Sequence, residues 1–483
     1  MIILLTIILY LGICILLGIF SRKYIVNPEH FFSGYRLFRG LFVGLASAAA
    51  IMTAFGFVGG PGLVYKMGAT SLWITLTQSL AFLFGAYAVG TKIVKLTLTR
   101  KIFSLADIVE MRYQSRKLIL LFDLTLLLGI FAYLGTQVLG VGLVFSYLFG
   151  IPPEIGGLIA FSVIFIYSII GGMVAHLVTN AFQGAIMVAA GIGALVGVLS
   201  LTGGIGGLFG PILEKAPIYA DPLGKAFWPL ALGWYWIFVI GNIAQPHNYI
   251  KYVNIKDIRD IRYLGLMGAV GYMLCCLLWI FMGYGSLFLL HTGKIPPLEN
   301  PDFAAFYVCR FLPDALAGLL FAGLLAAAMS TADIFLVLAA TAIGRDIPYA
   351  LTGRYPKKSI FWGRVACLIV TAVAFIYGCY GGYMVAILGA FGWGYFTTIL
   401  FPLLVIGMLW KGASKEGAIV TASLVLAMNV GFLILSRVFS ITTPVPDYII
   451  TLLVGIIVFV IVSFFTKGAK YEKIAPEVAS CME

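Results

Sequence analysis

Two hydroxyls and a carboxylate lie within the apolar stretch AGLLAAAMSTADIFLVLAA, residues 322–340. A helix turns by about 100° per residue, which puts Ser330 and Thr331 on one face together with Ala327. Hydroxyl oxygens and backbone carbonyls are neutral ligands for a small hard cation. Such hydroxyls can instead donate to the carbonyl one turn earlier in their own helix. The pair therefore indicates either half of a cation site or two ordinary helical hydroxyls.

Asp333 lies off this face, about 60° from Ser330 and about 160° from Thr331 around the helix. Ionisable residues inside a membrane are functional candidates, because burying a charge there is costly. The carboxylate could act on a nearby cation or carry a proton. It could also pair with Arg345 or face a cytoplasmic vestibule, and the sequence leaves these alternatives open.

The composition places this helix in a membrane protein. Of the 483 residues, 62% are hydrophobic and 10% are charged, whereas soluble proteins carry about 25% charged residues. Apolar runs of about 20 residues recur along the chain, and each is long enough to cross a bilayer core of about 30 Å. The runs lack the period-two alternation of β-barrel strands. The sequence therefore predicts an all-α polytopic membrane protein.

The apolar runs predict thirteen spans. They cover residues 2–20, 41–66, 71–94, 118–147, 153–173, 178–203, 226–248, 262–291, 312–344, 361–380, 382–409, 417–437 and 446–466. A short turn near His176 is expected to join the fifth span to the sixth.

The basic residues predict the orientation. With the N-terminus outside, only six of the 31 Lys and Arg residues fall on the outer side, which leaves 25 in the cytoplasmic segments. Lys and Arg collect in cytoplasmic loops, so we expect a cytoplasmic C-terminus and a protein of the plasma membrane. The net charge of +12 has the same explanation and predicts no nucleic-acid partner. The expected partners are the bilayer and a small solute, with no obligatory protein partner.

Two spans contain residues that interrupt a helix. The second span carries FVGGPGLVY (57–65), and the seventh carries VIGNIAQPHNYIKY (239–252). A transmembrane backbone can unwind only where protein or a water-filled cavity satisfies it. Transporters built from inverted repeats place broken helices at matching positions of the two halves, and these two spans are five apart. The alternative is that Gly and Pro are common in ordinary membrane helices.

Four stretches stand out along the chain: GLASAAAIMTAFGFVGGPGLVYKMG (44–68), YSIIGGMVAHLVTNAFQGAIM (167–187), LAAAMSTADIFLVLAATAIGRD (325–346) and FPLLVIGMLWKGASKEGAIV (401–420). Together they resemble the sodium:solute symporter family, which includes proline, pantothenate, sugar and sialic acid symporters. The resemblance covers nearly the whole chain and implies the leucine-transporter fold, with two inverted repeats of five spans. The repeats would be 41–203 (spans 2–6) and 226–409 (spans 7–11) within a core of 41–410, with 1–40 and 411–483 peripheral.

The resemblance also implies a sodium site. Its ligands would be the backbone carbonyls of Ala49, Met52 and Ala327 together with the hydroxyls of Ser330 and Thr331. Sodium would be the coupling ion, and no organic cofactor is expected. The seven Cys residues show no metal-binding spacing, so no other metal is expected.

The chain departs from the family pattern at two positions. A Thr-Asp pair of the family reads Thr179-Asn180 here, and an Asp of proline-type members aligns with Ile51. In some members the first of these Asp residues helps to bind a second sodium ion, so Asn180 argues against a second site. Thr179, Asn180 and Asp333 are the candidates for a second cation or proton site.

The solute is expected midway across the membrane, between the two broken spans. The candidate lining residues are Thr53, Phe55, Phe57, Gln78, Trp236, Asn242, Gln245, Phe391, Trp393 and Tyr395. Aromatic rings also fill ordinary helix interfaces, whereas the amides of Asn242 and Gln245 need hydrogen-bond partners. The predicted function is sodium-coupled symport of a small organic acid, such as pantothenate or a monocarboxylate, or of an amino acid such as proline, by alternating access.

Other functions fit the sequence less well. A membrane redox or haem enzyme needs axial ligands, but the four His residues are dispersed, and no enzymatic activity is predicted. A channel does not need two broken helices around a sealed site. No motif favours a transport-dead sensor. Proton-coupled symport on the same fold is the main alternative, with Asp333 as the proton carrier.

Overall fold

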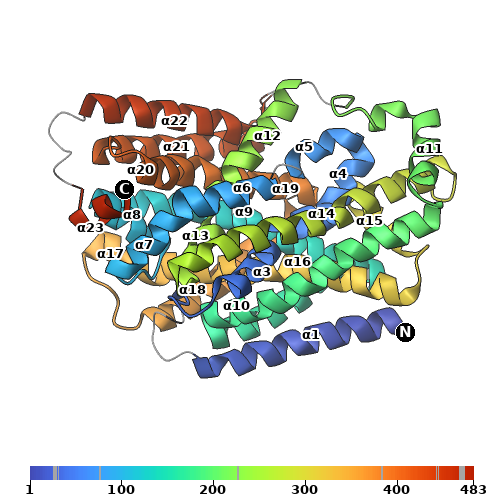
Figure 1. The fold of residues 1–483 in the computed structure, drawn as a ribbon, viewed down its shortest axis with the longest axis horizontal. Helices are drawn as coiled ribbons and strands as arrows, with labels where there is room; N and C mark the ends of the chain where they lie inside the picture. The colour runs from blue at the N-terminus through green and yellow to red at the C-terminus, as the bar shows by residue number, and fades with distance from the viewer. Residues whose placement is uncertain are drawn as a thin grey trace.

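The structure is a computed structural model that describes residues 1–24, 30, 32–75, 78–225, 228–381, 384–441, 443, 445–466 and 474–482 (Figure 1). Within these residues all regular structure is helical. Ten of the described helical segments are long and apolar enough to cross a membrane. The prediction of an all-α polytopic membrane protein is confirmed, whereas the count of thirteen spans stays a prediction.

The helices of the first predicted repeat follow one another from Gly40. They are α3 (Gly40–Ile51), α4 (Gly60–Met67), α5 (Leu72–Thr75), α6 (Gln78–Gly85), α7 (Thr91–Thr99), α8 (Leu105–Tyr113), α9 (Arg116–Phe149) and α10 (Pro153–Thr202).

The second predicted repeat begins after the linking helix α11 (Ile205–Lys215). Its helices are α12 (Trp228–Ile243), α13 (Pro246–Asn254), α14 (Ile261–His291), α15 (Ala304–Cys309), α16 (Asp314–Thr341), α17 (Ile347–Thr352), α18 (Ser359–Tyr380), α19 (Val385–Leu400) and α20 (Gly407–Leu409). The remaining helices are α1 (Ile2–Ser21), α21 (Lys415–Val438), α22 (Asp447–Thr466) and α23 (Pro476–Met482).

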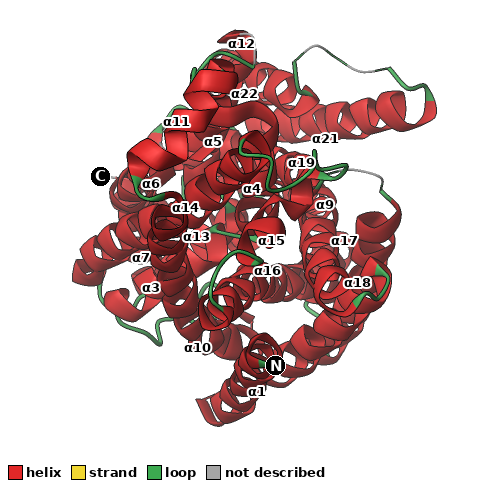
Figure 2. Ribbon diagram, turned by 90° about the vertical axis from the view of Figure 1, so that its right-hand side faces the viewer, coloured by secondary structure: helices red, strands yellow, loops and turns green. Residues whose placement is uncertain are grey.

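Helix α16 lies at the centre of the bundle. The long helices run mostly along the horizontal direction of Figure 1, and the two chain ends lie at opposite ends of the bundle. Viewed along the bundle, α16 is in the middle, while α1 and α22 lie near opposite edges (Figure 2). Every residue from Leu320 to Thr341 is buried, whereas α1 exposes apolar side chains such as Leu5 and Leu16. The polar residues of α16 therefore lie in the core, and α1 presents a surface suited to lipid.

The second predicted span is broken, but the break lies ahead of the predicted stretch 57–65, whose residues are helical. Helix α3 ends at Ile51, and Met52 has an extended backbone (φ −81°, ψ 106°). A π-helical turn, Phe55–Gly59, then leads into α4. Gly60 lets α4 touch α14, because a Cβ there would lie 2.3 Å from Cδ2 of Trp279.

The seventh predicted span is broken as well. Helix α12 ends at Ile243, and Gln245 is extended (φ −77°, ψ 133°) before α13 begins at Pro246. Proline suits the first position of a helix, because the N–H that it lacks has no intrahelical acceptor there.

The predicted turn near His176 is wrong. The chain instead bends at Gly172, whose backbone is non-helical (φ 49°, ψ −141°), and His176 lies one turn further along inside α10. His176 is only 1% exposed. A backbone with positive φ favours glycine over residues with a Cβ, so the glycine, rather than the polar histidine, marks the bend.

Replacing Gly172 by Ala should lower the melting temperature of the purified protein in detergent. The strained backbone at this position should cost about 1–3 kcal/mol once a Cβ is present. Gly206→Ala is the control, because Gly206 lies in α11 with open space around it and has no positive φ. Equal melting temperatures for Gly172→Ala and the unaltered protein would contradict the bend.

Candidate functional site

The hydroxyls of α16 face the end of α3. Ser330 Oγ donates to the Ala49 carbonyl at 2.9 Å and to the Ala327 carbonyl at 3.1 Å. Thr331 Oγ1 lies 3.1 Å from the Ala327 carbonyl and 3.4 Å from that of Ala50. All of these residues are fully buried. Four of the five predicted sodium ligands therefore meet where α3 stops.

Neutral oxygens predominate at this junction. A cation placed there would be coordinated by hydroxyl and carbonyl oxygens in place of the hydrogen bonds between α16 and α3. Met52, the fifth predicted ligand, is the first residue outside the regular backbone of α3. Small residues at positions 327 and 328 let the two backbones approach. The arrangement can hold a small cation without a fixed negative charge among these groups.

Gln137 of α9 supports the break after α3. Its Oε1 accepts a hydrogen bond from the Ala54 N–H at 3.0 Å, and its Nε2 donates to the Tyr133 carbonyl at 2.9 Å. Thr53, a predicted solute residue, accepts from the Phe55 N–H through its hydroxyl at 3.1 Å. These side chains satisfy N–H groups that the broken helix frees.

Asn242 and Gln245 support the break between α12 and α13. Asn242 Nδ2 donates to the Gln78 carbonyl at 2.9 Å, and Asn242 Oδ1 accepts from Asn248 at 3.0 Å. Both ends of the Asn242 amide are therefore used within the protein. Gln245 Nε2 donates to the Trp393 carbonyl at 3.3 Å, while Gln245 Oε1 has no partner among the residues that the structure describes.

A buried cluster of rings lies beside the break of span 7. The ring of Tyr133 is 5.1 Å from that of Phe335 and 6.3 Å from that of Trp393, measured between centroids. The imidazole of His247 lies 5.8 Å from Phe335 and 6.4 Å from Trp393. We call Tyr133, His247, Phe335, Trp393 and Gln245 the central cluster.

The central cluster contains polar atoms that lack partners. The Tyr133 hydroxyl and both ring nitrogens of His247 are buried without a hydrogen bond to any described residue. The Tyr133 hydroxyl approaches the Thr53 side chain, but without the geometry of a hydrogen bond. Buried polar atoms are normally paired, so these groups can receive a bound molecule.

Tyr133 and His247 are candidate site residues that the sequence motifs did not indicate. His247 lies two residues after Gln245 in the interrupted stretch, and Tyr133 lies one turn before Gln137 on α9. The available signal for His247 was its position as a polar residue next to the break in span 7.

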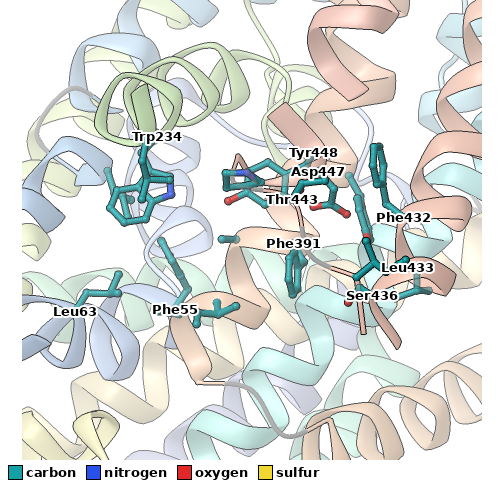
Figure 3. Close-up of a pocket in the computed structure, with 18 residues that line it drawn as sticks. Phe55, Leu63, Trp234, Phe391, Phe432, Leu433, Ser436, Thr443, Asp447 and Tyr448 are labelled. Carbon is teal, nitrogen blue, oxygen red and sulfur yellow. The ribbon is translucent and has the colours of Figure 1, made fainter. Parts of the chain in front are cut away.

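A second part of the predicted solute set lines an outer cavity of about 310 Å³. Phe55, Phe391 and Tyr395 belong to its wall, together with Trp234 and Asp447. Figure 3 shows Phe55 and Trp234 on one side of this space and Asp447 on the other, with Phe391 between them. The wall is mainly apolar and aromatic, so the cavity can admit an apolar group next to the break in span 2.

Five predicted solute residues join neither the central cluster nor the outer cavity: Thr53 and Asn242 support the two breaks, and three others lie elsewhere. Trp236 is 55% exposed and packs edge-on against Tyr235, so it belongs to the outer surface. Gln78 donates to the Ile74 carbonyl of its own segment at 2.8 Å. Phe57 is fully buried and lies against Gly323 of α16. Hydrophobic or amide character alone did not reveal which way these side chains point.

Asp333 contacts His176, and the Arg345 alternative does not hold. Asp333 Oδ1 lies 2.5 Å from His176 Nδ1. Arg345 instead donates to Asp107 of α8 at 2.9 Å and to Asp346 at 2.5 Å. Sequence spacing along α16 could not reveal that Asp333 meets His176 or that Arg345 meets Asp107, because each of these contacts joins segments far apart in the chain.

Thr179 and Asn180 lie beside the same turn of α16. Thr179 Oγ1 is 3.5 Å from Asp333 Oδ2, and Asn180 Nδ2 donates to the Ser330 carbonyl at 3.0 Å. All three candidates for a second cation or proton site therefore lie near the hydroxyl face.

The loop before α15 covers the end of the bundle at which the N-terminus lies. Asp302 Oδ2 accepts from the Val385 N–H at 3.0 Å and so caps α19. Burial raises the pKa of the Asp302 carboxyl to about 6, although the Val385 N–H opposes this rise. The loop also packs on α4, because a Cβ on Gly62 would lie 2.7 Å from the Pro301 carbonyl. The loop therefore bridges α4 and α19 at this end of the bundle.

Solved structures share this fold. A Na⁺-coupled sialic acid symporter in a substrate-bound, outward-open state superposes with a TM-score of 0.78 at 18% identity, covering 96% of this chain and 98% of that one. Mhp1, a nucleobase-cation-symport-1 family transporter, gives a TM-score of 0.55 at 15% identity, covering 95% and 99%. The chain therefore shares its fold with these two structures.

Sequence comparison gives the family. The sodium:solute symporter family matches residues 31–425, and the chain belongs to that family. It is 25% identical to a sodium/pantothenate symporter of Haemophilus influenzae over 398 residues, covering 80% of this chain and 81% of the relative. It is 26% identical to a sodium/proline symporter of Staphylococcus aureus over 479 residues, covering 95% and 91%. The protein is a sodium-coupled transporter and not an enzyme.

Replacing Gln137 by Met should lower the unfolding free energy by about 1–3 kcal/mol, because it leaves the buried Ala54 N–H without an acceptor. Gln78→Met is the matched control, since the Gln78 side chain is buried and bonds within its own segment. Thermal unfolding in detergent measures both variants. An equal loss for the two variants would contradict the role of Gln137 at the break.

Proposed function

We propose that this symporter carries a small organic solute with an apolar body and a carboxylate, together with sodium, into the cell. The observation that carries the proposal is that the Ser330 hydroxyl meets the Ala49 carbonyl, and the Thr331 hydroxyl the Ala50 carbonyl, at the end of α3. Sodium bound there would join α16 to the first broken helix, next to the solute. Linkage then requires that each ligand raises the affinity for the other by the same factor.

The central cluster is proposed to hold the polar end of the solute. Its groups carry no fixed positive charge, so a carboxylate would be received by the Tyr133 hydroxyl, an N–H of His247 and the N-terminal end of α13. The outer cavity, with Phe55 and Phe391, would take the apolar body. Pantothenate and proline, which the named relatives carry, both have a carboxylate, and this supports the proposed solute class.

Transport is proposed to follow alternating access in the plasma membrane. The N-terminus would lie outside and the C-terminus in the cytoplasm, as the distribution of Lys and Arg predicts. The repeats 41–203 and 226–409 would rock against each other around the central cluster. The loop at Asp302 would open on the outer side, and the contacts between α3 and α16 would part on the inner side.

Replacing Ser330 by Ala and Thr331 by Val should raise the sodium concentration for half-maximal uptake by roughly ten-fold or more, because two ligands are lost. Uptake of labelled pantothenate, proline, lactate and alanine into proteoliposomes with an inward sodium gradient provides the measurement. Thr341→Val is the control, because Thr341 is buried in the same helix and bonds only one turn back, at 2.8 Å, to Val337. A double variant with unchanged sodium dependence would rule out this sodium site.

Replacing Tyr133 by Phe should raise the KM of the transported solute by roughly ten-fold, because a buried hydrogen bond to a charged group is lost. Sodium binding without solute should not change. Trp236→Phe, on the exposed side of α12, should stay within about two-fold of the unaltered protein. If both variants have the same KM, the central cluster is not the solute site.

A further inference from the structure

Three buried side chains form a line across three helices. The Lys251 ammonium of α13 lies 2.9 Å from Nε2 of His176 in α10. Nδ1 of the same imidazole lies 2.5 Å from the Asp333 carboxylate of α16. None of the three is more than 1% exposed. The line thus connects a buried ammonium to a buried carboxylate through a single ring.

The polarity of the line follows from its two ends. An ammonium has only hydrogen atoms to offer and a carboxylate only lone pairs. With Lys251 and Asp333 both charged, Nε2 of His176 accepts from Lys251, and Nδ1 carries the proton that is donated to Asp333. This is the neutral imidazole, with both nitrogens bonded. The positive charge of Lys251 then balances the negative charge of Asp333, because an uncompensated buried charge is costly.

The line adjoins the proposed sodium site. Asp333 follows Thr331 by two residues, and Asn180 joins the two sites, because its Nδ2 donates to the Ser330 carbonyl at 3.0 Å and lies 3.4 Å from His176 Nε2. A carboxylate so close to a cation site would attract a second free cation unless another positive charge were fixed nearby. Lys251 is that charge, and it is held on the protein.

We infer that Lys251 acts as a tethered cation, which through His176 supplies Asp333 with the charge that a second ion would otherwise bring, so that the carrier binds one sodium ion per chain. The inference rests on the sodium site proposed above. It goes beyond that site by fixing the number of ions. The number matters for transport, because each further coupled ion adds its own electrochemical gradient to the driving force.

Equilibrium binding of ²²Na⁺ to the purified protein, without solute, tests the inference. The unaltered protein should bind one ion per chain with a Hill coefficient of one. Lys251→Met frees the Asp333 carboxylate, so the stoichiometry should rise to two. Lys251→Met combined with Asp333→Asn removes both charges and should return it to one.

Two controls separate charge from structure. Lys256→Met removes an exposed lysine five residues after Lys251 and should bind as the unaltered protein does. The Ser330→Ala, Thr331→Val variant should lose the single ion. Each variant is compared only as a monodisperse peak in size-exclusion chromatography.

Asp333→Asn gives a second route if Lys251→Met fails to fold. It leaves the Lys251 ammonium without its counter-charge near the sodium site, so the sodium Kd should rise at least three-fold. Adding Lys251→Met should restore the Kd. If Lys251 and Asp333 had only a structural role, adding Lys251→Met would not restore the sodium Kd.

The outcomes are distinct. Two ions bound to the unaltered protein would overturn the inference, as would a Lys251→Met protein that still binds one ion with unchanged Kd. A Kd that Asp333→Asn raises and the double variant does not restore would also overturn it. No ion bound to the unaltered protein would overturn the proposed sodium site itself.

Discussion

The unpaired backbone of two broken helices is the constraint on which the rest of the structure depends. Inside a membrane no bulk water replaces a lost helical hydrogen bond, so each freed group needs a partner from the protein or from a ligand. Gln137 supplies an acceptor at Ala54, and the amides of Asn242 and Gln245 brace the other break. The polar groups near the breaks that these side chains leave without a hydrogen bond define where ligands can bind. The site is therefore a consequence of the breaks and not an addition to the fold.

Helix α16 is continuous beside the point where α3 ends, so an ion bound between them would contact two different kinds of backbone. Helix α16 offers two hydroxyls together with the Ala327 carbonyl, whereas the end of α3 offers carbonyls alone. Ser330 and Thr331 bridge the two kinds of oxygen. An ion at this proposed site would change the attraction between a continuous helix and an interrupted one. This is the physical content of coupling, since an ion can shift a conformational equilibrium only by binding one arrangement better than another.

The sequence indicated local features well and tertiary partners poorly. Apolar runs predicted the helical class, and the Gly and Pro residues of 239–252 predicted the break in span 7. The break in span 2 lies at Met52 and Thr53, ahead of the Gly and Pro residues of 57–65, which are helical. Helical periodicity put Ser330 and Thr331 on one face. It could not show that Asp333 meets His176, because that contact joins residues 157 positions apart. Trp236 was misplaced for a related reason: its neighbours along α12 do not reveal which side of the helix faces the core.

The line from Lys251 to Asp333 also constrains the proposed movement. Both charged residues lie in the second predicted repeat, whereas His176 lies in the first. A displacement of one repeat against the other must therefore stretch at least one of the two bonds of the imidazole. The same displacement would separate Ser330 from Ala49, because these residues also lie in different repeats. Loss of the proposed sodium ligands and loss of charge balance at Asp333 are then parts of one event. The buried Asp333 carboxylate therefore favours the arrangement in which the Ser330–Ala49 contact and the His176 hydrogen bonds are both made.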